Sequence, residues 1–181
     1  MNENRCVIGV YSTHVDAENA IKDLHGSGIN MQQCSIAGQG CEAEQEVVGF
    51  YNAGDRMLCW GKHGAFWGGV WGLLAGSGFF VIPGLGPVLA GGALVSSIVG
   101  GLQGAFVVGG LNALGAGLYS LGIPRDSVIR YQTAIKENRF VVLFKGTAVE
   151  AAQARKVLSR TRAEILEDLV PEDRPEPGVT G

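Results

Sequence analysis

Short apolar runs alternate with amphipathic segments near both ends of the chain, and a long uncharged stretch separates the two ends. Residues 6–12 (CVIGVYS), 33–38 (QCSIAG) and 139–146 (RFVVLFKG) are rich in apolar and β-branched residues, so each predicts a short buried strand. Residues 162–169 (RAEILEDL) suit a last strand and a helix equally well.

Two helices are predicted with their start signals. In THVDAENAIKDLHGSGI, Thr13 can cap a helix that has Asp16 three residues later, and apolar residues follow at helical spacing. Gly26 suits the left-handed position at the end of this helix. In TAVEAAQARKVLSRT, Thr147 and Glu150 have the spacing of a capping box.

The predicted order is β-α-β, a long insert, and then β-α-β. This order is typical of a ferredoxin-like split βαβ domain of class α+β, with four antiparallel strands and two helices on one face. A further helix is predicted at 124–137, before the second β-α-β unit. We expect four segments: the first half of the domain at 1–58, the insert at 59–123, the second half at 124–169, and a disordered tail at 170–181.

The uncharged stretch runs from Gly64 to Pro124 and contains no Asp, Glu, Lys, Arg or His. Small residues recur there at every fourth position, a spacing that lets two helix backbones approach closely. The pattern therefore predicts an α-helical hairpin built as a glycine zipper. The candidate helix-packing residues are Gly64, Gly68, Gly72, Gly76, Gly92, Gly100, Gly101, Gly104, Gly109 and Gly117, and the candidate turn residues are Pro83, Gly84, Gly86 and Pro87.

The length of the first arm suggests a membrane. As a helix, residues 64–82 would span about 28 Å at about 1.5 Å per residue, close to the thickness of a bilayer core. Basic residues lie both before and after the stretch, whereas the predicted turn carries no charge. This distribution places both ends of the hairpin on the cytoplasmic side and favours an inner-membrane hairpin with a cytoplasmic α/β domain. The alternative is a cytoplasmic homo-oligomer that buries the hairpin, and the polar residues Gln103 and Asn112 of the second arm favour it.

Charge and motifs exclude several function classes. The net charge of −3 gives no basic field for nucleic acid. Neither GLGPVLAGG nor GSGFF completes G-x-G-x-x-G, and WGKHG lacks the Ser or Thr of a phosphate-binding loop. The start of the chain indicates no cleaved signal peptide. Four cysteines without CxxC spacing indicate reduced thiols.

No catalytic constellation is evident, so we expect a protein that is not an enzyme and that needs no cofactor or metal. Cys59 and His63 have i, i+4 spacing, but only Asp55 could join them as a zinc ligand. His25 is a surface or capping residue at a helix end. The glutamates of the loop form a solvated acidic face: Glu42, Glu44 and Glu46.

Several segments resemble the bacterial general stress protein 17M-like family, over roughly residues 5–160. The most specific are IPGLGP (82–87) and the GIP step (122–124) before the helix that contains Tyr131. The resemblance implies a small α/β domain interrupted by a glycine-rich hydrophobic hairpin, and a link to stress. It implies no catalytic residues.

Three functions remain open. The first is a membrane-associated, stress-related protein that self-associates through its hairpin, with membrane lipid and further copies of itself as partners. The second is a pore or permease-like oligomer in which Gln103 and Asn112 line a polar path. The third is a soluble oligomeric sensor for an unidentified small molecule, which rests on fold analogy alone.

Overall fold

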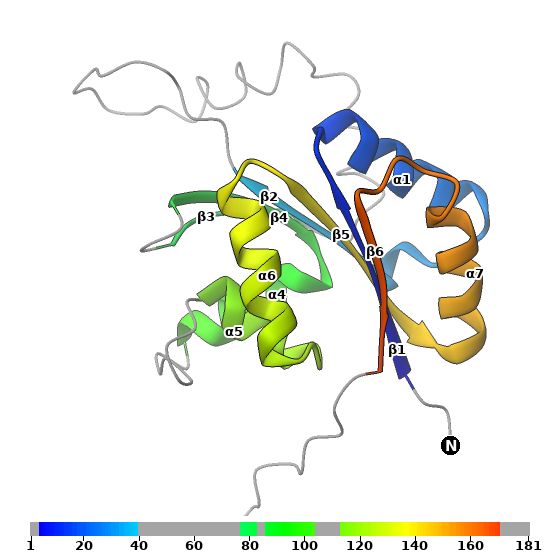
Figure 1. Ribbon diagram of the computed structural model, residues 1–181. Coiled ribbons are helices and arrows are strands. Elements are labelled where there is room, and N and C mark those ends of the chain that lie inside the picture. The colour runs from blue at the N-terminus through cyan, green and yellow to red at the C-terminus, as the bar shows by residue number, and fades with distance from the viewer. Residues whose placement is uncertain (1–3, 40–76, 83–85, 104–112, 171–181) are drawn as a thin grey trace, which may run out of the picture.

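The computed structural model describes residues 4–39, 77–82, 86–103 and 113–170 (Figure 1). The strands are β1 (Asn4–Tyr11), β2 (Cys34–Gln39), β3 (Ser77–Ile82), β4 (Gly86–Gly92), β5 (Phe140–Thr147) and β6 (Ile165–Leu169). The α-helices are α1 (His14–Gly26), α4 (Ala93–Gln103), α5 (Ala113–Ser120), α6 (Arg125–Lys136) and α7 (Ala148–Leu158), and a 3₁₀ turn covers Met31–Gln33.

The six strands form one antiparallel sheet in the order β3-β4-β2-β5-β1-β6. Strands β1 and β5 pair in its interior, from Asn4 opposite Thr147 to Tyr11 opposite Phe140. The predicted α+β class with an antiparallel sheet is therefore confirmed. The segment at 162–169, which suited a strand and a helix equally well, contains strand β6.

Both faces of the central strands are apolar. Along β1, Val7 and Tyr11 belong to one buried cluster, whereas Ile8 and Val10 belong to the other. Since successive residues of a strand point to opposite faces, each face needs a cover. Helices α1 and α7 cover one face and α4, α5 and α6 cover the other, which gives three layers (Figure 1).

The first core lies between the sheet and helices α1 and α7. Its large side chains come from the strands and from the inward stripe of α1 that the sequence predicts. The buried residues include Val7, Tyr11, Ala17, Ala20, Ile21, Leu24, Ile36, Val142, Phe144, Ala151, Ala154 and Leu158. At roughly 25 cal/mol per Å² of buried apolar surface, such a cluster is a main source of stability.

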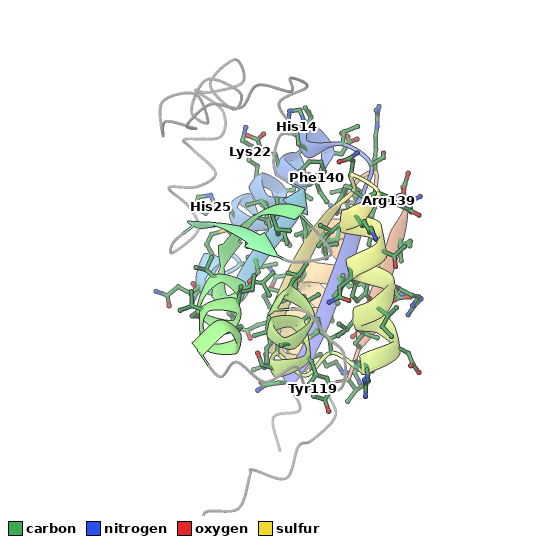
Figure 2. The ribbon with its side chains drawn as sticks, turned by 90° about the vertical axis from the view of Figure 1, so that its left-hand side faces the viewer. His14, Lys22, His25, Tyr119, Arg139 and Phe140 are labelled. Carbon is green, nitrogen blue, oxygen red and sulfur yellow. The ribbon has the colours of Figure 1, made fainter. Side chains whose placement is uncertain are left out.

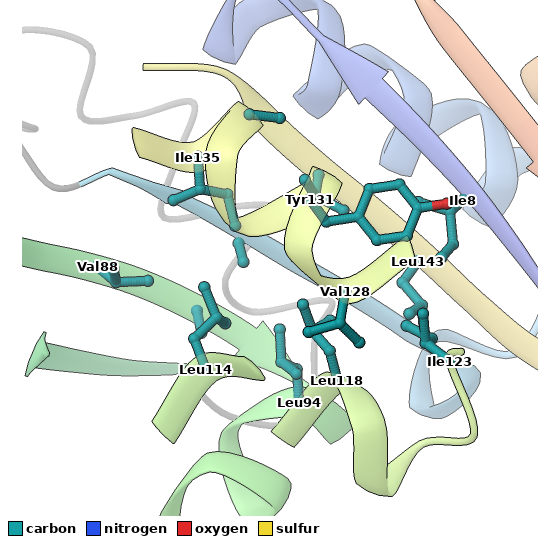
Figure 3. Close-up of a cluster of buried hydrophobic side chains, with 14 of the residues drawn as sticks. Ile8, Val88, Leu94, Leu114, Leu118, Ile123, Val128, Tyr131, Ile135 and Leu143 are labelled. Carbon is teal, nitrogen blue, oxygen red and sulfur yellow. The ribbon is translucent and has the colours of Figure 1, made fainter. Parts of the chain in front are cut away.

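The second core lies between the sheet and the three helices that follow β4 (Figure 3). It includes strand residues Ile8, Val10, Val88, Ala90, Val141 and Leu143 and helix residues Leu94, Ile98, Leu114, Leu118, Val128, Tyr131 and Ile135. The uncharged stretch thus supplies a large part of this core.

The capping predictions are confirmed at two helices. The Thr13 side chain accepts a hydrogen bond from the Asp16 backbone N–H, and Thr147 and Glu150 form a complete capping box. The prediction for Gly26 is wrong. That residue ends α1 in helical conformation, and the left-handed backbone, with φ of +81°, occurs two residues later at Gly28.

The helical hairpin predicted for residues 59–123 is wrong where strands replace it. Residues 77–82 form β3 instead of the end of a helix, and Gly86 and Pro87 begin β4 instead of closing a turn. Pairing explains the outcome, because β4 hydrogen-bonds to β3 on one side and to β2 on the other. A short apolar run such as GFFVI cannot be assigned to helix or strand by periodicity alone.

The transmembrane prediction is also wrong for the residues that the structure describes. None of their helices is long and apolar enough to cross a membrane. The return arm contains α4 with 11 residues and α5 with 8, whereas a bilayer needs about 20. Most of the first arm, residues 64–76, lies outside the described ranges.

The chain turns from β4 into α4 at Gly92, which has a φ of +83°. A Cβ atom there would lie 2.0 Å from the carbonyl oxygen of Cys34 in the neighbouring strand. Next to this contact, the buried Ser35 Oγ accepts a hydrogen bond of 3.1 Å from the Leu94 N–H. A strand hydroxyl therefore caps the first turn of α4 and fixes the helix to the sheet.

We expect Gly92→Ala to destabilise the protein by at least about 2 kcal/mol, because the methyl group adds both positive-φ strain and a clash with rigid backbone. Urea unfolding followed by circular dichroism would measure the loss. Gly26→Ala is the control, since a Cβ there meets nothing within 4 Å and should stabilise slightly. Equal effects of the two substitutions would contradict this account of the junction.

Candidate functional site

The residues predicted to pack helices do not form one continuous series. Gly92 lies in β4, Gly100 and Gly101 lie in α4, and Gly117 lies in α5. Of the turn residues, Gly86 and Pro87 lie in β4. The remaining predicted positions lie outside the described residues: Gly64, Gly68, Gly72, Gly76, Gly104, Gly109, Pro83 and Gly84.

Gly117 of α5 lies directly against α4. A Cβ on Gly117 would meet Ile98 Cγ1 at 3.0 Å and the Ile98 backbone nitrogen at 3.3 Å. The absence of a side chain at this position therefore lets the two backbones approach. The helices pack within one chain, over the sheet, and their inner side chains Leu94, Ile98, Leu114 and Leu118 are buried.

The outward side of this layer is uncharged. Residues 93–103 and 113–120 contain no Asp, Glu, Lys, Arg or His. We call the exposed pair Ser96 and Val99 the α4 outer face. Figure 2 looks onto this side of the molecule, with α4 and α5 in front of the sheet. An uncharged outer helix in a protein with ordinary charged helices elsewhere is a candidate interaction surface.

A polar cluster joins α6 to the edge strand β6. Arg130 holds Glu167 with two hydrogen bonds, from Nη1 to Oε1 at 2.7 Å and from Nη2 to Oε2 at 3.1 Å. The hydroxyl of Tyr131 donates to the same Oε2 atom, and Arg130 Nη2 also donates to Ser127 Oγ at 3.2 Å. Burial, and next the hydrogen bond to Glu167, raise the pKa of Tyr131 well above its usual range. The phenol is thus a fixed donor that holds the two elements together.

The other face of β6 carries a second ionic contact. Asp168 Oδ2 lies 3.5 Å from Arg5 Nη1 and 4.0 Å from Arg155 Nη1. These pairs are partly exposed, so each adds about 1 kcal/mol or less. Together with Glu167, they hold the short edge strand from both sides. This arrangement can position β6, but it brings no nucleophile next to a base.

The two described thiols are inert. Cys6 and Cys34 are buried and free, and burial raises the pKa of Cys6 to about 11 and that of Cys34 to about 12. A thiol must ionise to act as a nucleophile, so neither cysteine suits catalysis at neutral pH.

The metal candidates of the sequence cannot be placed. Cys59, His63, Asp55 and the three loop glutamates lie outside the described residues, as does Asn112. Within the described ranges, no three potential ligands come together. His25 is exposed in the last turn of α1, as the sequence predicts, and Gln103 is the last residue of α4.

One buried carboxylate was missed by sequence reasoning. Glu18 on α1 is fully buried, neither of its oxygens has a hydrogen-bond partner in the structure, and Lys22 Nζ lies 3.6 Å from Oε1. Burial raises the pKa of Glu18, and the charge of Lys22 opposes this shift. The sequence held one signal of this burial: Glu18 follows the inward-facing Ala17 and comes three residues before the inward-facing Ile21.

Comparison with known proteins does not identify a family. No protein-family model matches the chain, and neither the curated proteins nor the solved structures contain a significant match. The resemblance to the general stress protein 17M-like family therefore stays a prediction from the sequence.

We expect Glu18→Gln to stabilise the protein at neutral pH. The buried carboxylate has a raised pKa, so its ionised form costs stability above that pKa, and the cost disappears as the pH falls through it. The difference between variant and wild type should be largest at pH 7 and shrink in the acid range. Urea unfolding across this range would measure the difference.

Glu150→Gln is the matched control with the opposite sign. Hydrogen bonds from the Thr147 backbone and side chain lower the pKa of Glu150, so its contribution is present at neutral pH and is lost in acid. This variant should be less stable than wild type at pH 7. A Glu18→Gln variant that behaves in the same way would contradict the account of Glu18.

We expect Tyr131→Phe to cost about 1.5 to 3 kcal/mol, because the hydroxyl bonds to a charged carboxylate. Tyr11→Phe is the comparison, since Tyr11 bonds to the neutral hydroxyl of Thr161 at 2.8 Å and should cost about 0.5 to 1.5 kcal/mol. Equilibrium unfolding of both variants would test the ranking. A smaller loss for Tyr131→Phe would show that Arg130 alone satisfies Glu167.

Proposed function

We propose that the chain is a non-enzymatic interaction module that self-associates. One observation carries the proposal: the outer helices α4 and α5 cover a face of the sheet but carry no charged residue. Helices exposed to water usually carry polar and charged residues on their outer side. An uncharged outer layer is suited to contact with another protein surface.

We also infer that part of the chain is a ferredoxin-like split βαβ unit. The strand order β2-β5-β1-β6 and the connections β1-α1-β2 and β5-α7-β6 support this inference, with both helices on one face. In this interpretation, β3, β4, α4, α5 and α6 are additions. The strands lengthen the sheet beyond β2, and the helices fill the face that a two-layer unit leaves open.

The filled face argues against a ligand site on the sheet. Apolar side chains from β1, β5 and α6 meet there, and Ile8, Leu143 and Ile135 are almost completely buried (Figure 3). The raised pKa values of Cys6 and Cys34 also argue against thiol chemistry. Binding is therefore assigned to the outer surface. The sensor alternative and the stress-related role stay predictions from sequence, and the pore is not retained because it required the membrane hairpin.

The self-association proposal predicts a mass above that of one 19.0 kDa chain. Sedimentation velocity and light scattering on the full chain, over a dilution series, would measure it. A dimer or larger closed assembly at the highest concentrations, with dissociation on dilution, is the expected result. A single monomeric species at every concentration would reject the proposal.

A further inference from the structure

We infer that two copies of this chain dock through the α4 outer face, with α4 of one copy against α4 of the other about a two-fold axis. The inference rests on the proposed self-association and names the surface that makes it. Ser96 and Val99 form the centre of the contact.

The distribution of charge selects this surface. In a two-fold dimer the same patch meets itself, so each charge near the axis approaches its own copy. Helix α5 is as uncharged as α4, whereas the remaining described helices expose charged residues: Asp23 on α1, Arg130 and Lys136 on α6, and Arg155 and Lys156 on α7. With a net charge of −3 on each chain, two copies repel in general, and an uncharged layer avoids this cost.

The distribution of exposed apolar side chains also selects the α4 outer face. Val99 is 38% exposed, and its neighbours one turn away on α4, Val95, Ser96 and Gln103, are uncharged. The other exposed aliphatic residues of the described helices lie in helices that also carry charged residues, Val15 in α1, Ile129 in α6 and Val149 in α7. Val99 is the exposed aliphatic side chain of the uncharged layer, so covering it desolvates no charge on its own helix.

The serine hydroxyl groups of α4 and α5 can also be buried at low cost. Ser96 Oγ donates to the Ala93 carbonyl at 2.9 Å, Ser97 Oγ donates to the same oxygen at 3.3 Å, and Ser120 Oγ donates to the Gly117 carbonyl at 2.7 Å. These three hydroxyl donors are thus satisfied within their own helices. A second copy that covers the three serines leaves none of their donors unpaired, which lowers the usual cost of burying serine. Ser96 is also small enough for close helix approach.

The test compares Val99→Glu with Val149→Glu in the full chain. Glutamate at position 99 would face its own copy across the axis, so the dimer dissociation constant should rise by at least about 100-fold. Val149 is 80% exposed on α7, on the other side of the sheet, and its substitution should leave the constant unchanged. Unfolding curves of both variants would confirm that each is folded.

A crosslinking experiment gives an independent result. In a Cys41→Ser, Cys59→Ser background, Ser96→Cys should give a covalent dimer with a short bismaleimide, since Cys6 and Cys34 are buried. Ser159→Cys is the matched control, because Ser159 is also exposed and also donates to a helix carbonyl, that of Lys156 at 2.9 Å. It should give no dimer.

The outcomes separate the two proposals. A wild-type protein that is monomeric overturns both. A wild-type dimer that survives Val99→Glu and shows no crosslink through Ser96→Cys overturns the α4 interface and leaves self-association standing. A monomer whose Ser96→Cys thiol reacts slowly with maleimide shows that the chain covers this face itself, and this result also overturns the second copy as occupant.

Discussion

The structure depends on one constraint: the central strands β1 and β5 are apolar on both faces. Val7 and Tyr11 point to one side and Ile8 and Val10 to the other, and Val142 and Phe144 alternate with Val141 and Leu143 in the same way. A sheet with two apolar faces is stable in water only as the middle layer of three. Helices α1 and α7 supply one cover, and the stretch after β4 must supply the other (Figure 1).

The attachment of that second cover is local and specific. Strand β4 joins the free edge of β2, Gly92 turns the chain against the Cys34 carbonyl, and Ser35 caps α4. From there α4 and α5 pack closely at Gly117, and α6 is tied to β6 by Tyr131, Arg130 and Glu167. Apolar burial provides the bulk of the stability, while these polar contacts fix the position of the helices.

The proposed function rests on where the polar and uncharged surfaces lie. The described thiols are buried with raised pKa values, and the polar groups at β6 bond to one another. The described surface with an unusual composition is the outer side of α4, where an exposed valine and internally bonded serines lie in a helix without charge. The inner side of α4 is buried in the core, whereas its outer side faces away from the sheet. Core packing and the proposed self-association therefore use different faces of the same helix.

The sequence by itself determined the elements with strong local signals. Strands β1, β2 and β5 were predicted from their composition, and helices α1 and α7 from their capping residues and apolar spacing. The absence of charge over residues 64–124 also indicated that this stretch is not an ordinary charged surface. Local signals could not show what covers those residues, because small and apolar residues suit lipid, a partner and a protein core equally well. For the described part of the stretch, only the tertiary structure decided this, by pairing β4 with β2 and placing Leu94, Ile98, Leu114 and Leu118 on a sheet face whose own apolar residues required a cover.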